Sequence, residues 1–245
     1  ERFLPSGRVQ YFPMCDYQGD GGFACRLTGQ AYQVTAKRTV DATWLKTSVP
    51  ATHTPGFTIA EAVRFIPVNA LTDVQAAPDR YVVIGGGKTG IDAVLWLLEN
   101  RVAPQAITWI MPRDGWLIDR RNTQPTEDFF AESIGAQAAQ MESIAGADSV
   151  ADMFDRLEAS GYFLRIDPTV RPTMFHGATI SQAELEQLRR VTDIVRMGRV
   201  QALEPERIVL EHGERATTAN TLHIDCSASA IPNLDIKSVF EGDLI

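Results

Sequence analysis

The sequence predicts an α/β fold built around a Rossmann-like domain, and two observations support this prediction. The apolar segment Tyr81–Ile84 leads directly into the glycine-rich turn Gly85–Gly90, and residues 91–100 have the character of a helix. A second apolar segment, residues 107–111, follows that helix. Strand, helix and strand within about thirty residues form a right-handed crossover, which places the two strands parallel in one sheet.

The segments before the glycine-rich turn predict short strands separated by irregular chain. Prolines punctuate the connection that precedes the turn, at positions 50, 55 and 67. Pro78 and Asp79 then come just before the Tyr81 strand, so we place a domain boundary there. The predicted strands, which are rich in β-branched and aromatic side chains, cover residues 7–12, 31–36 and 39–44.

The segments after residue 111 predict helices first and strands later. Residues 126–145 and 149–159 favour helices. Ser181 and Glu184 have the spacing of a capping box, which predicts a helix that continues through Arg190. The later strands are expected at residues 194–203, 207–211 and 222–226.

The bulk composition narrows the classes of protein to which the chain can belong. With 245 residues, of which 44% are hydrophobic, the chain can bury a sizeable core in one or two domains. A net charge of -8 argues against a nucleic-acid-binding surface, and no apolar run approaches the roughly 20 residues that span a bilayer. No basic and apolar leader pattern opens the sequence, and Cys15, Cys25 and Cys226 form neither a CxxC pair nor a metal-binding pattern. These observations predict a cytoplasmic protein, and a first residue other than methionine is consistent with a piece of a longer chain.

The turn Gly85–Gly90 has the GxGxxG spacing of a dinucleotide-binding fingerprint. Gly85 would permit the tight turn, Gly87 would let a phosphate approach the backbone, and Gly90 would let the helix pack against the strand. One alternative is a tight turn that binds nothing. The other is a nucleoside-triphosphatase P-loop, which would need a glycine where the chain has Val82. The predicted cofactor-binding residues of the turn are Gly85, Gly86, Gly87, Lys88, Thr89 and Gly90.

The segment after the second strand bears on which dinucleotide binds. An acidic residue at the end of that strand would bond the ribose 2′-hydroxyl of NAD, but the chain has Arg113 just beyond it, and a guanidinium can pair with the 2′-phosphate of NADP. Arg120 and Arg121 are near enough in sequence to assist. An NAD site remains an alternative because of Asp114. A further alternative is that all three arginines are solvated loop charges with no role in binding. We therefore predict NADP as the cofactor, with Arg113 and Arg120 among its ligands.

Several phrases of the sequence resemble the two-dinucleotide-binding flavoproteins, the group that contains flavin-dependent monooxygenases and pyridine nucleotide-disulfide oxidoreductases. The phrases are LPSGRVQYFP, VDATW, YVVIGGGKTGIDAVLWLL, WIMPRDGWL and LHIDCSASA. In that group an NAD(P)H-binding domain is inserted into an FAD-binding domain. The resemblance implies that residues 78–220 form a Rossmann-like NAD(P)-binding domain, while residues 1–77 and 221–245 belong to the FAD-type domain.

The resemblance also implies a second cofactor, FAD, near a small-residue turn at Ser227. The chain departs from the family in three places. No second GxGxxG precedes Tyr81, the FxGxxxHxxxW signature of monooxygenases has no match in the right order around His53, and Ser229 stands where the family favours glycine. The main FAD fingerprint is therefore absent from this chain.

The residues predict no catalytic side chain. His53 and His176 are interpreted as ordinary loop histidines. The alternatives are that His53 contacts the nicotinamide or flavin and that His176 lines a substrate pocket. Trp116 is a ring that either packs or stacks on an adenine. The expected function is that of an FAD-dependent, NADP(H)-using, monooxygenase-like oxidoreductase of a small molecule, in which the cofactors carry the hydride chemistry. The alternative is an NAD(P)-binding sensor without turnover. We expect no nucleic-acid partner and no membrane span, and the sequence leaves the oligomeric state open.

Overall fold

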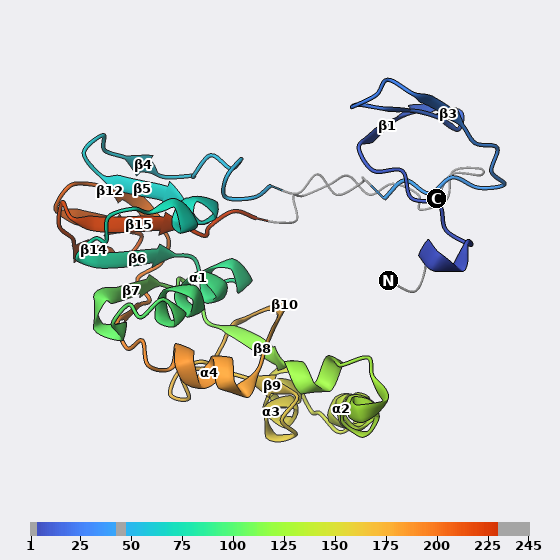
Figure 1. The fold of residues 1–245 in the computed structure, drawn as a ribbon. Coiled ribbons are helices and arrows are strands. Elements are labelled where there is room, and N and C mark those ends of the chain that lie inside the picture. Colours follow the sequence, from blue (N-terminus) through green and yellow to red (C-terminus); the bar gives the residue numbers. More distant parts are fainter. Residues whose placement is uncertain (1–3, 43–47, 230–245) are drawn as a thin grey trace. The chain divides into compact units, whose positions relative to one another are not determined.

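A computed structural model describes residues 4–42 and 48–229, which belong to two compact units (Figure 1). We call residues 4–42 the N-terminal unit and residues 48–229 the main unit. Each is described by itself below.

The N-terminal unit contains one antiparallel sheet with the strand order β1-β2-β3. A 3-10 turn, Leu4–Ser6, precedes the sheet. The rings of Phe12, Phe23 and Tyr32 pack on one another with centroids 4.8, 5.0 and 5.2 Å apart, and they supply the apolar cluster of this small unit. The strands are β1 (Cys15–Gly19), β2 (Gly22–Cys25) and β3 (Ala31–Gln33).

The sequence-based prediction of strands is largely wrong in this unit. Residues 7–12 form no strand, because this segment contributes the ring of Phe12 to the aromatic cluster instead of pairing its backbone. Residues 39–42 form no strand either, and residues 43–44 of that prediction lie outside the described residues. The hairpin β1–β2 was not predicted. Its tight turn depends on Gly19 and Gly21, whose φ angles of +96° and +77° lie in a region that favours glycine.

A parallel sheet of five strands forms the centre of the main unit, in the order β11-β7-β6-β15-β5 (Figure 1). Every neighbouring pair in it is parallel. The prediction of a mixed α/β fold with parallel strands around the glycine-rich turn is therefore confirmed. The strands are β5 (Arg64–Pro67), β6 (Arg80–Ile84), β7 (Ile107–Ile110), β11 (Ile194–Val195) and β15 (Thr221–Asp225).

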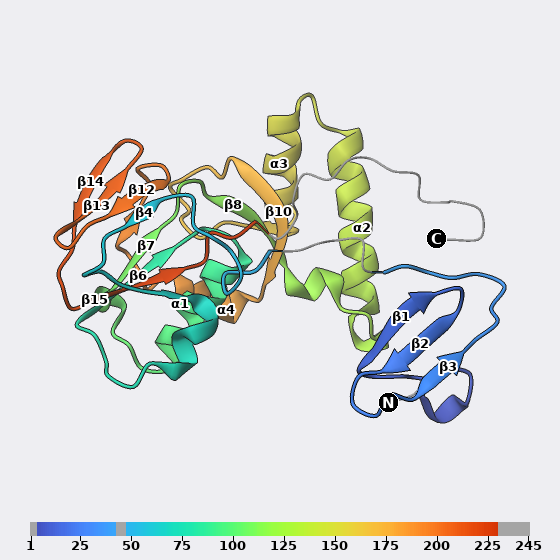
Figure 2. The same cartoon turned by 90° about the horizontal axis from the view of Figure 1, so that it is seen from above.

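The parallel sheet is buried on both faces, and alternate residues of β6 serve different cores. Tyr81 and Val83 join the core formed with helices α1 (Lys88–Glu99) and α4 (Gln182–Leu188). Val82 and Ile84 join a second core, on the face covered by another sheet (Figure 2). A strand buried on both faces reads as a continuous apolar run, which explains the uninterrupted YVVI segment. The covering sheet has the order β14-β13-β12-β4, with β4 (Thr58–Ile59), β12 (Val200–Leu203), β13 (Arg207–Leu210) and β14 (Gly213–Ala216).

A third group of elements packs around an aromatic cluster. Trp116 and Phe163 stack with Phe154, and Leu157 completes this small core. The prediction of two consecutive helices here is confirmed, although the first begins with a 3-10 turn, Glu127–Phe129. The elements are β8 (Gly115–Asp119), β9 (Phe163–Leu164), β10 (Met174–Ile180), α2 (Phe130–Ala145) and α3 (Val150–Ala159).

Two further predictions of the sequence are corrected by the main unit. Residues 194–203 form two strands rather than one, because the chain turns at Gly198 (φ +79°) to pass from the parallel sheet to the covering sheet. His176 lies in strand β10 and not in a loop. The predicted domain limits fall at residues 77/78 and 220/221, yet β5, β6 and β15 share one sheet. That three-part division stays a prediction.

Candidate functional site

The glycine-rich turn lies at the carboxyl end of β6, between that strand and α1. From β6 the chain continues to β7 and β11 on one side of the sheet, whereas β15 and β5 lie on the other side. The strand order thus reverses at β6. In open parallel sheets, ligands bind outside the carboxyl ends of the strands at such a reversal.

Two of the three fingerprint glycines are required by close backbone approach, and the third faces open space. A Cβ atom at Gly85, where φ is +131°, would lie 2.5 Å from the carbonyl oxygen of Cys226. A Cβ at Gly90 would lie 2.0 Å from the carbonyl oxygen of Gly85. At Gly87 no atom lies within 4 Å of the Cβ position. These are the conformational roles that the spacing predicted, while cofactor binding itself stays a prediction.

The other residues of the turn connect it to β7 and to α1. A Cβ at Gly86 would lie 2.7 Å from Cγ of Met111 and 3.2 Å from the carbonyl oxygen of Arg113, so the chain that follows β7 runs beside the turn. Lys88 forms an ion pair with Asp92, one helical turn further on. Thr89 is exposed at the start of the helix.

The N-terminus of α1 is open toward the turn. Gly87 occupies the N-cap position and provides no side-chain cap, and the first turn contains no acidic residue. The first backbone N–H groups of a helix have no partner within the helix, and together with the helix dipole they favour an anion. The carbonyl oxygen of Gly85 is fixed by the indole N–H of Trp109, which donates to it at 2.8 Å. The sequence does not predict this bond, because the position of a residue in a strand does not identify the hydrogen-bond partner of its side chain.

The two charged residues that follow β7 have different surroundings. Arg113 is exposed, and within residues 4–42 and 48–229 its guanidinium has no ion pair. Asp114 is buried and accepts two hydrogen bonds from Arg196, at 2.7 and 2.9 Å, and Arg196 also lies 3.2 Å from Asp167. Hydrogen bonding to Asp114 raises the pKa of the Arg196 guanidinium, so this arginine stays charged. The only acid beside Arg113 in sequence is therefore occupied by an internal ion pair.

Arg120 and Arg121 are engaged away from the turn. Arg120 lies 3.1 Å from the carboxylate of Glu184, which is also the capping-box residue of α4. Arg121 lies 3.0 Å from the carboxylate of Asp119, a side chain with no exposed surface. Among the contacts of the described residues, none joins either arginine to the glycine-rich turn. Of the predicted arginines, the structure thus brings only Arg113 beside it.

Ser227 lies in the turn that follows β15, next to the glycine-rich turn. The backbone N–H of Cys226 donates to the carbonyl oxygen of Ile84 at 2.9 Å, and the hydroxyl of Ser227 donates to Asp225 at 2.6 Å. Burial raises the pKa of the Cys226 thiol to about 12, so this cysteine is unreactive near neutral pH. The ends of β6, β7 and β15 therefore meet around Gly85.

The remaining candidate side chains are structural or lie elsewhere. Trp116 is 3% exposed and stacked among aromatic rings, so it is not available to an adenine. His223 is buried in β15 with Nδ1 3.2 Å from the carbonyl oxygen of Arg64, and burial lowers its pKa, which keeps the ring neutral. His176 is exposed in β10. None of these is brought to the glycine-rich turn by a contact of the described residues.

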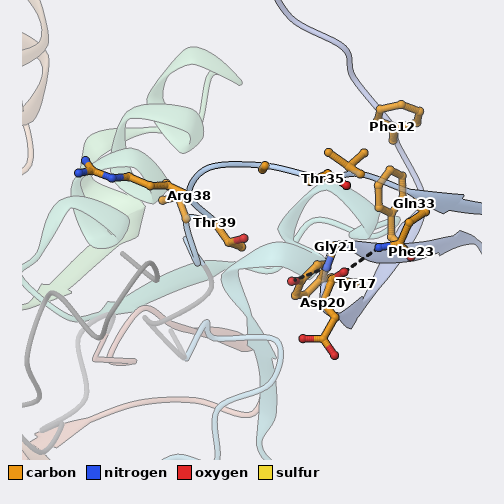
Figure 3. Close-up of a pocket in the computed structure, with 12 residues that line it drawn as sticks. Phe12, Tyr17, Asp20, Gly21, Phe23, Gln33, Thr35, Arg38 and Thr39 are labelled. Carbon is orange, nitrogen blue, oxygen red and sulfur yellow. Dashed lines mark hydrogen bonds between the residues drawn. The ribbon is translucent and has the colours of Figure 1, made fainter.

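A separate hollow of about 670 Å³ lies in the N-terminal unit (Figure 3). The aromatic side chains that line it are Phe12, Tyr17 and Phe23. The backbone N–H of Gly21 donates to the hydroxyl of Tyr17 at 3.2 Å, which holds that ring beside the β1–β2 turn. No sequence motif pointed to this hollow.

Two features are absent from the described residues. Within them, no group of three or more His, Cys, Asp or Glu side chains could hold a metal ion. None of the helices in residues 4–42 and 48–229 combines the length and apolar character needed to cross a membrane.

Comparison with known proteins finds relatives but no family assignment. No family model matches the chain. The chain is 49% identical over 244 residues to uncharacterized proteins of Mycobacterium bovis and of two strains of Mycobacterium tuberculosis. These alignments cover 99% of this chain and 45% of each relative, so the chain spans less than half the length of the relatives it matches.

Proposed function

We propose that the main unit binds NADP(H) at the glycine-rich turn and that the full-length protein is an FAD-dependent, NADPH-using oxidoreductase of the two-dinucleotide-binding flavoprotein type. One observation carries this proposal. The turn Gly85–Gly90 stands at the reversal of strand order in a parallel sheet, with open space at Gly87 and the backbone of the exposed Arg113 beside it.

The residues around the turn fit a pyrophosphate. Gly87 presents backbone without a side chain, and the uncapped start of α1 offers N–H donors with the positive end of the helix dipole. Lys88 adds a positive charge at the same place, although Asp92 shares it. In this arrangement backbone N–H groups, rather than side chains, would hold most of the pyrophosphate.

The charges beyond β7 favour NADP over NAD. A carboxylate that bonds the ribose 2′-hydroxyl is the usual mark of an NAD site. Here the buried Asp114 is bonded to Arg196 through both oxygens, so recruiting it for a ribose would break a partly buried ion pair. Arg113 is exposed and can pair with a 2′-phosphate. Arg120 is a weaker candidate because it would first have to leave Glu184.

The flavin belongs to the proposal for the full-length protein. Bound nicotinamide supplies hydride and bound flavin accepts it, so the protein's task is to orient the two. Ser227 lies two residues after β15, and β15 belongs to the segment that resembles the return strand of the flavoprotein family. The relatives are more than twice as long as this chain, which leaves ample length for an FAD fingerprint of their own.

A binding titration tests the NADP(H) site. Isothermal titration of the chain with NADPH and with NADH should give tighter binding of NADPH. Arg113→Ala should weaken NADPH binding roughly 10- to 140-fold, because a charge-assisted hydrogen bond contributes about 1.5–3 kcal/mol, and should leave NADH binding unchanged. Arg190→Ala is the matched control. Arg190 is also an exposed arginine, but it precedes β11, whereas the glycine-rich turn and Arg113 follow their strands. Equal affinities for both cofactors, or equal losses in both variants, would refute the assignment.

The flavin and the alternative function are separated in the full-length protein. A yellow protein whose flavin absorbance bleaches on addition of NADPH under anaerobic conditions would support the oxidoreductase. A colourless full-length protein that binds NADPH without oxidising it would instead identify the NAD(P)-binding sensor.

A further inference from the structure

The β1–β2 hairpin brings two cysteines together that lie ten positions apart in the sequence. Cys15 and Cys25 are directly opposite each other in the antiparallel register of β1 and β2. The sequence spacing argued against a dithiol motif, because no CxxC or CxxxxC pattern is present. The tight turn through Gly19 and Gly21 produces the pairing that the spacing does not.

The backbone geometry of this pair suits a disulfide. The N–H of Arg26 donates to the carbonyl oxygen of Met14 at 2.8 Å, so the hydrogen bonds flank the cysteine pair rather than joining it. Residues opposite each other at such positions have Cα atoms about 4.5 Å apart. Disulfides span Cα separations of about 4.4–6.8 Å, so the bridge can form without movement of the strands. The irregularity of the hairpin lies beyond Tyr17 and does not disturb this pair.

The two thiols are also accessible and chemically unequal. Both are partly exposed, in contrast to Cys226, which is buried. Hydrogen bonding to the Thr28 side chain, and then to the backbone of Thr28 and Leu27, lowers the pKa of the Cys25 thiol. Partial burial and the neighbouring Cys25 raise the pKa of the Cys15 thiol. Cys25 therefore has the larger thiolate fraction at neutral pH, and Cys15, directly opposite it, is placed to act as the resolving thiol.

We propose that Cys15 and Cys25 form a reversible, redox-active dithiol whose oxidant is a hydroperoxide. The Cys25 thiolate attacks the outer peroxide oxygen, the O–O bond breaks, and the leaving alkoxide or hydroxide takes a proton to become an alcohol or water. Cys25 is then a sulfenic acid. The Cys15 thiol attacks the Cys25 sulfur, the S–S bond forms, and the sulfenic oxygen leaves as water with the thiol proton. The pair thus gives two electrons to the peroxide, and two external thiol groups return them, passing through a mixed disulfide and ending as a disulfide of their own.

Formation of the disulfide would affect the hollow of the N-terminal unit. Tyr17 lies opposite Phe23 in the hairpin, two residues along each strand from the cysteines. Their side chains therefore lie on the same face of the hairpin as Cys15 and Cys25. Both rings line the hollow. A bridge beside them restricts the hairpin at that end of the hollow. This inference does not depend on the proposed cofactors.

Peptide mapping of the complete chain tests the proposal. The reduced chain is freed of reductant, treated with hydrogen peroxide, blocked with N-ethylmaleimide and digested with a protease that cleaves before aspartate. Cleavage before Asp16 and Asp20 separates the two cysteines, so the peptide that ends at Cys15 and the peptide that holds Cys25 stay joined only through a disulfide. Mass spectrometry should find this joined species with two hydrogens fewer than its parts, and dithiothreitol should release it.

Variants make the outcome decisive. Cys226→Ser should leave the linkage intact. In Cys15→Ser, dimedone should trap a sulfenic acid on Cys25, whereas Cys25→Ser should leave Cys15 largely unmodified by the same dose of peroxide. Separate peptides with both cysteines blocked by maleimide, linkage of Cys25 to Cys226, or bridges only between two chains would each overturn the proposal.

Discussion

Replacing Gly90 by alanine tests the tightest backbone contact of the candidate site. The new Cβ would lie 2.0 Å from the carbonyl oxygen of Gly85, whereas ordinary contact begins at 3.4 Å, so about 1.4 Å must be recovered by movement. The opposing atom is backbone, and it is further held by the indole N–H of Trp109. Neither partner can therefore rotate away as a flexible side chain would.

The magnitude follows from three contributions. Overpacking of this kind costs about 1–3 kcal/mol. Loss of the bond between Trp109 and Gly85 would add about 1 kcal/mol, and the greater helix propensity of alanine would return about 1 kcal/mol. The last two nearly cancel, so Gly90→Ala should destabilise α1 by about 1–3 kcal/mol.

Gly135→Ala is the matched control for this substitution. Gly135 lies inside α2, is exposed, and has no atom within 4 Å of its Cβ position. Only the helix propensity should act there, so the variant should be stabilised by about 0.5–1 kcal/mol.

Hydrogen exchange is the suitable assay because two compact units need not unfold together. Amides of α1 should exchange roughly 5- to 140-fold faster in Gly90→Ala, and amides of α2 roughly 2- to 5-fold slower in Gly135→Ala. If Gly90→Ala leaves exchange in α1 unchanged or slower, the close approach of strand, turn and helix described here is refuted.

Two further predictions concern ligand affinity and acid stability. Gly87→Ala should change the unfolding free energy by no more than about 0.5 kcal/mol, because the new Cβ meets no atom. It should nevertheless weaken NADPH binding at least tenfold in a titration, since a pyrophosphate must approach that backbone. Unchanged affinity would contradict pyrophosphate binding at the glycine-rich turn. Burial raises the pKa of Asp119, but hydrogen bonds from Arg121 and Gln182 outweigh it and leave the pKa lowered. The carboxylate's stabilisation is thus present above the unfolded pKa of 3.8 and is lost as the pH falls through the folded value. Asp119→Asn should lower the unfolding free energy at pH 7 by about 1.5 kcal/mol, the lower end of the usual contribution of a charged hydrogen bond, because Arg121 is exposed. In urea unfolding measured at several pH values, the variant should lose less stability than the unmodified protein as the pH falls. Parallel acid limbs in the two proteins would contradict this account.

The parallel core was predictable from the sequence because its signals are local. An uninterrupted apolar run such as YVVI is typical of a strand buried on both faces, and the glycine spacing indicates the turn that follows. The capping box at Ser181 is likewise local, and the structure contains both of its hydrogen bonds. The helix nevertheless ends at Leu188 rather than Arg190, since helix ends depend on the packing that follows.

The contacts that complete the candidate site could not be predicted, because they join distant segments. The partner of Asp114 is Arg196, and the partner of Arg120 is Glu184. No spacing rule connects such residues, so the sequence left Asp114 and Arg120 open as cofactor ligands. The pairing of Cys15 with Cys25 was missed for a related reason: the hairpin turn was not recognised between two weak strands.

The bond between Trp109 and Gly85 has an optical consequence. The indole of Trp109 is fully buried, and its nitrogen is fixed to the carbonyl of the glycine-rich turn. Any event that moves this turn must alter the polarity or the hydrogen bonding around that chromophore. Trp109 is one of four tryptophans of the chain. Its share of the ultraviolet emission therefore reports on the first glycine of the fingerprint without an added label.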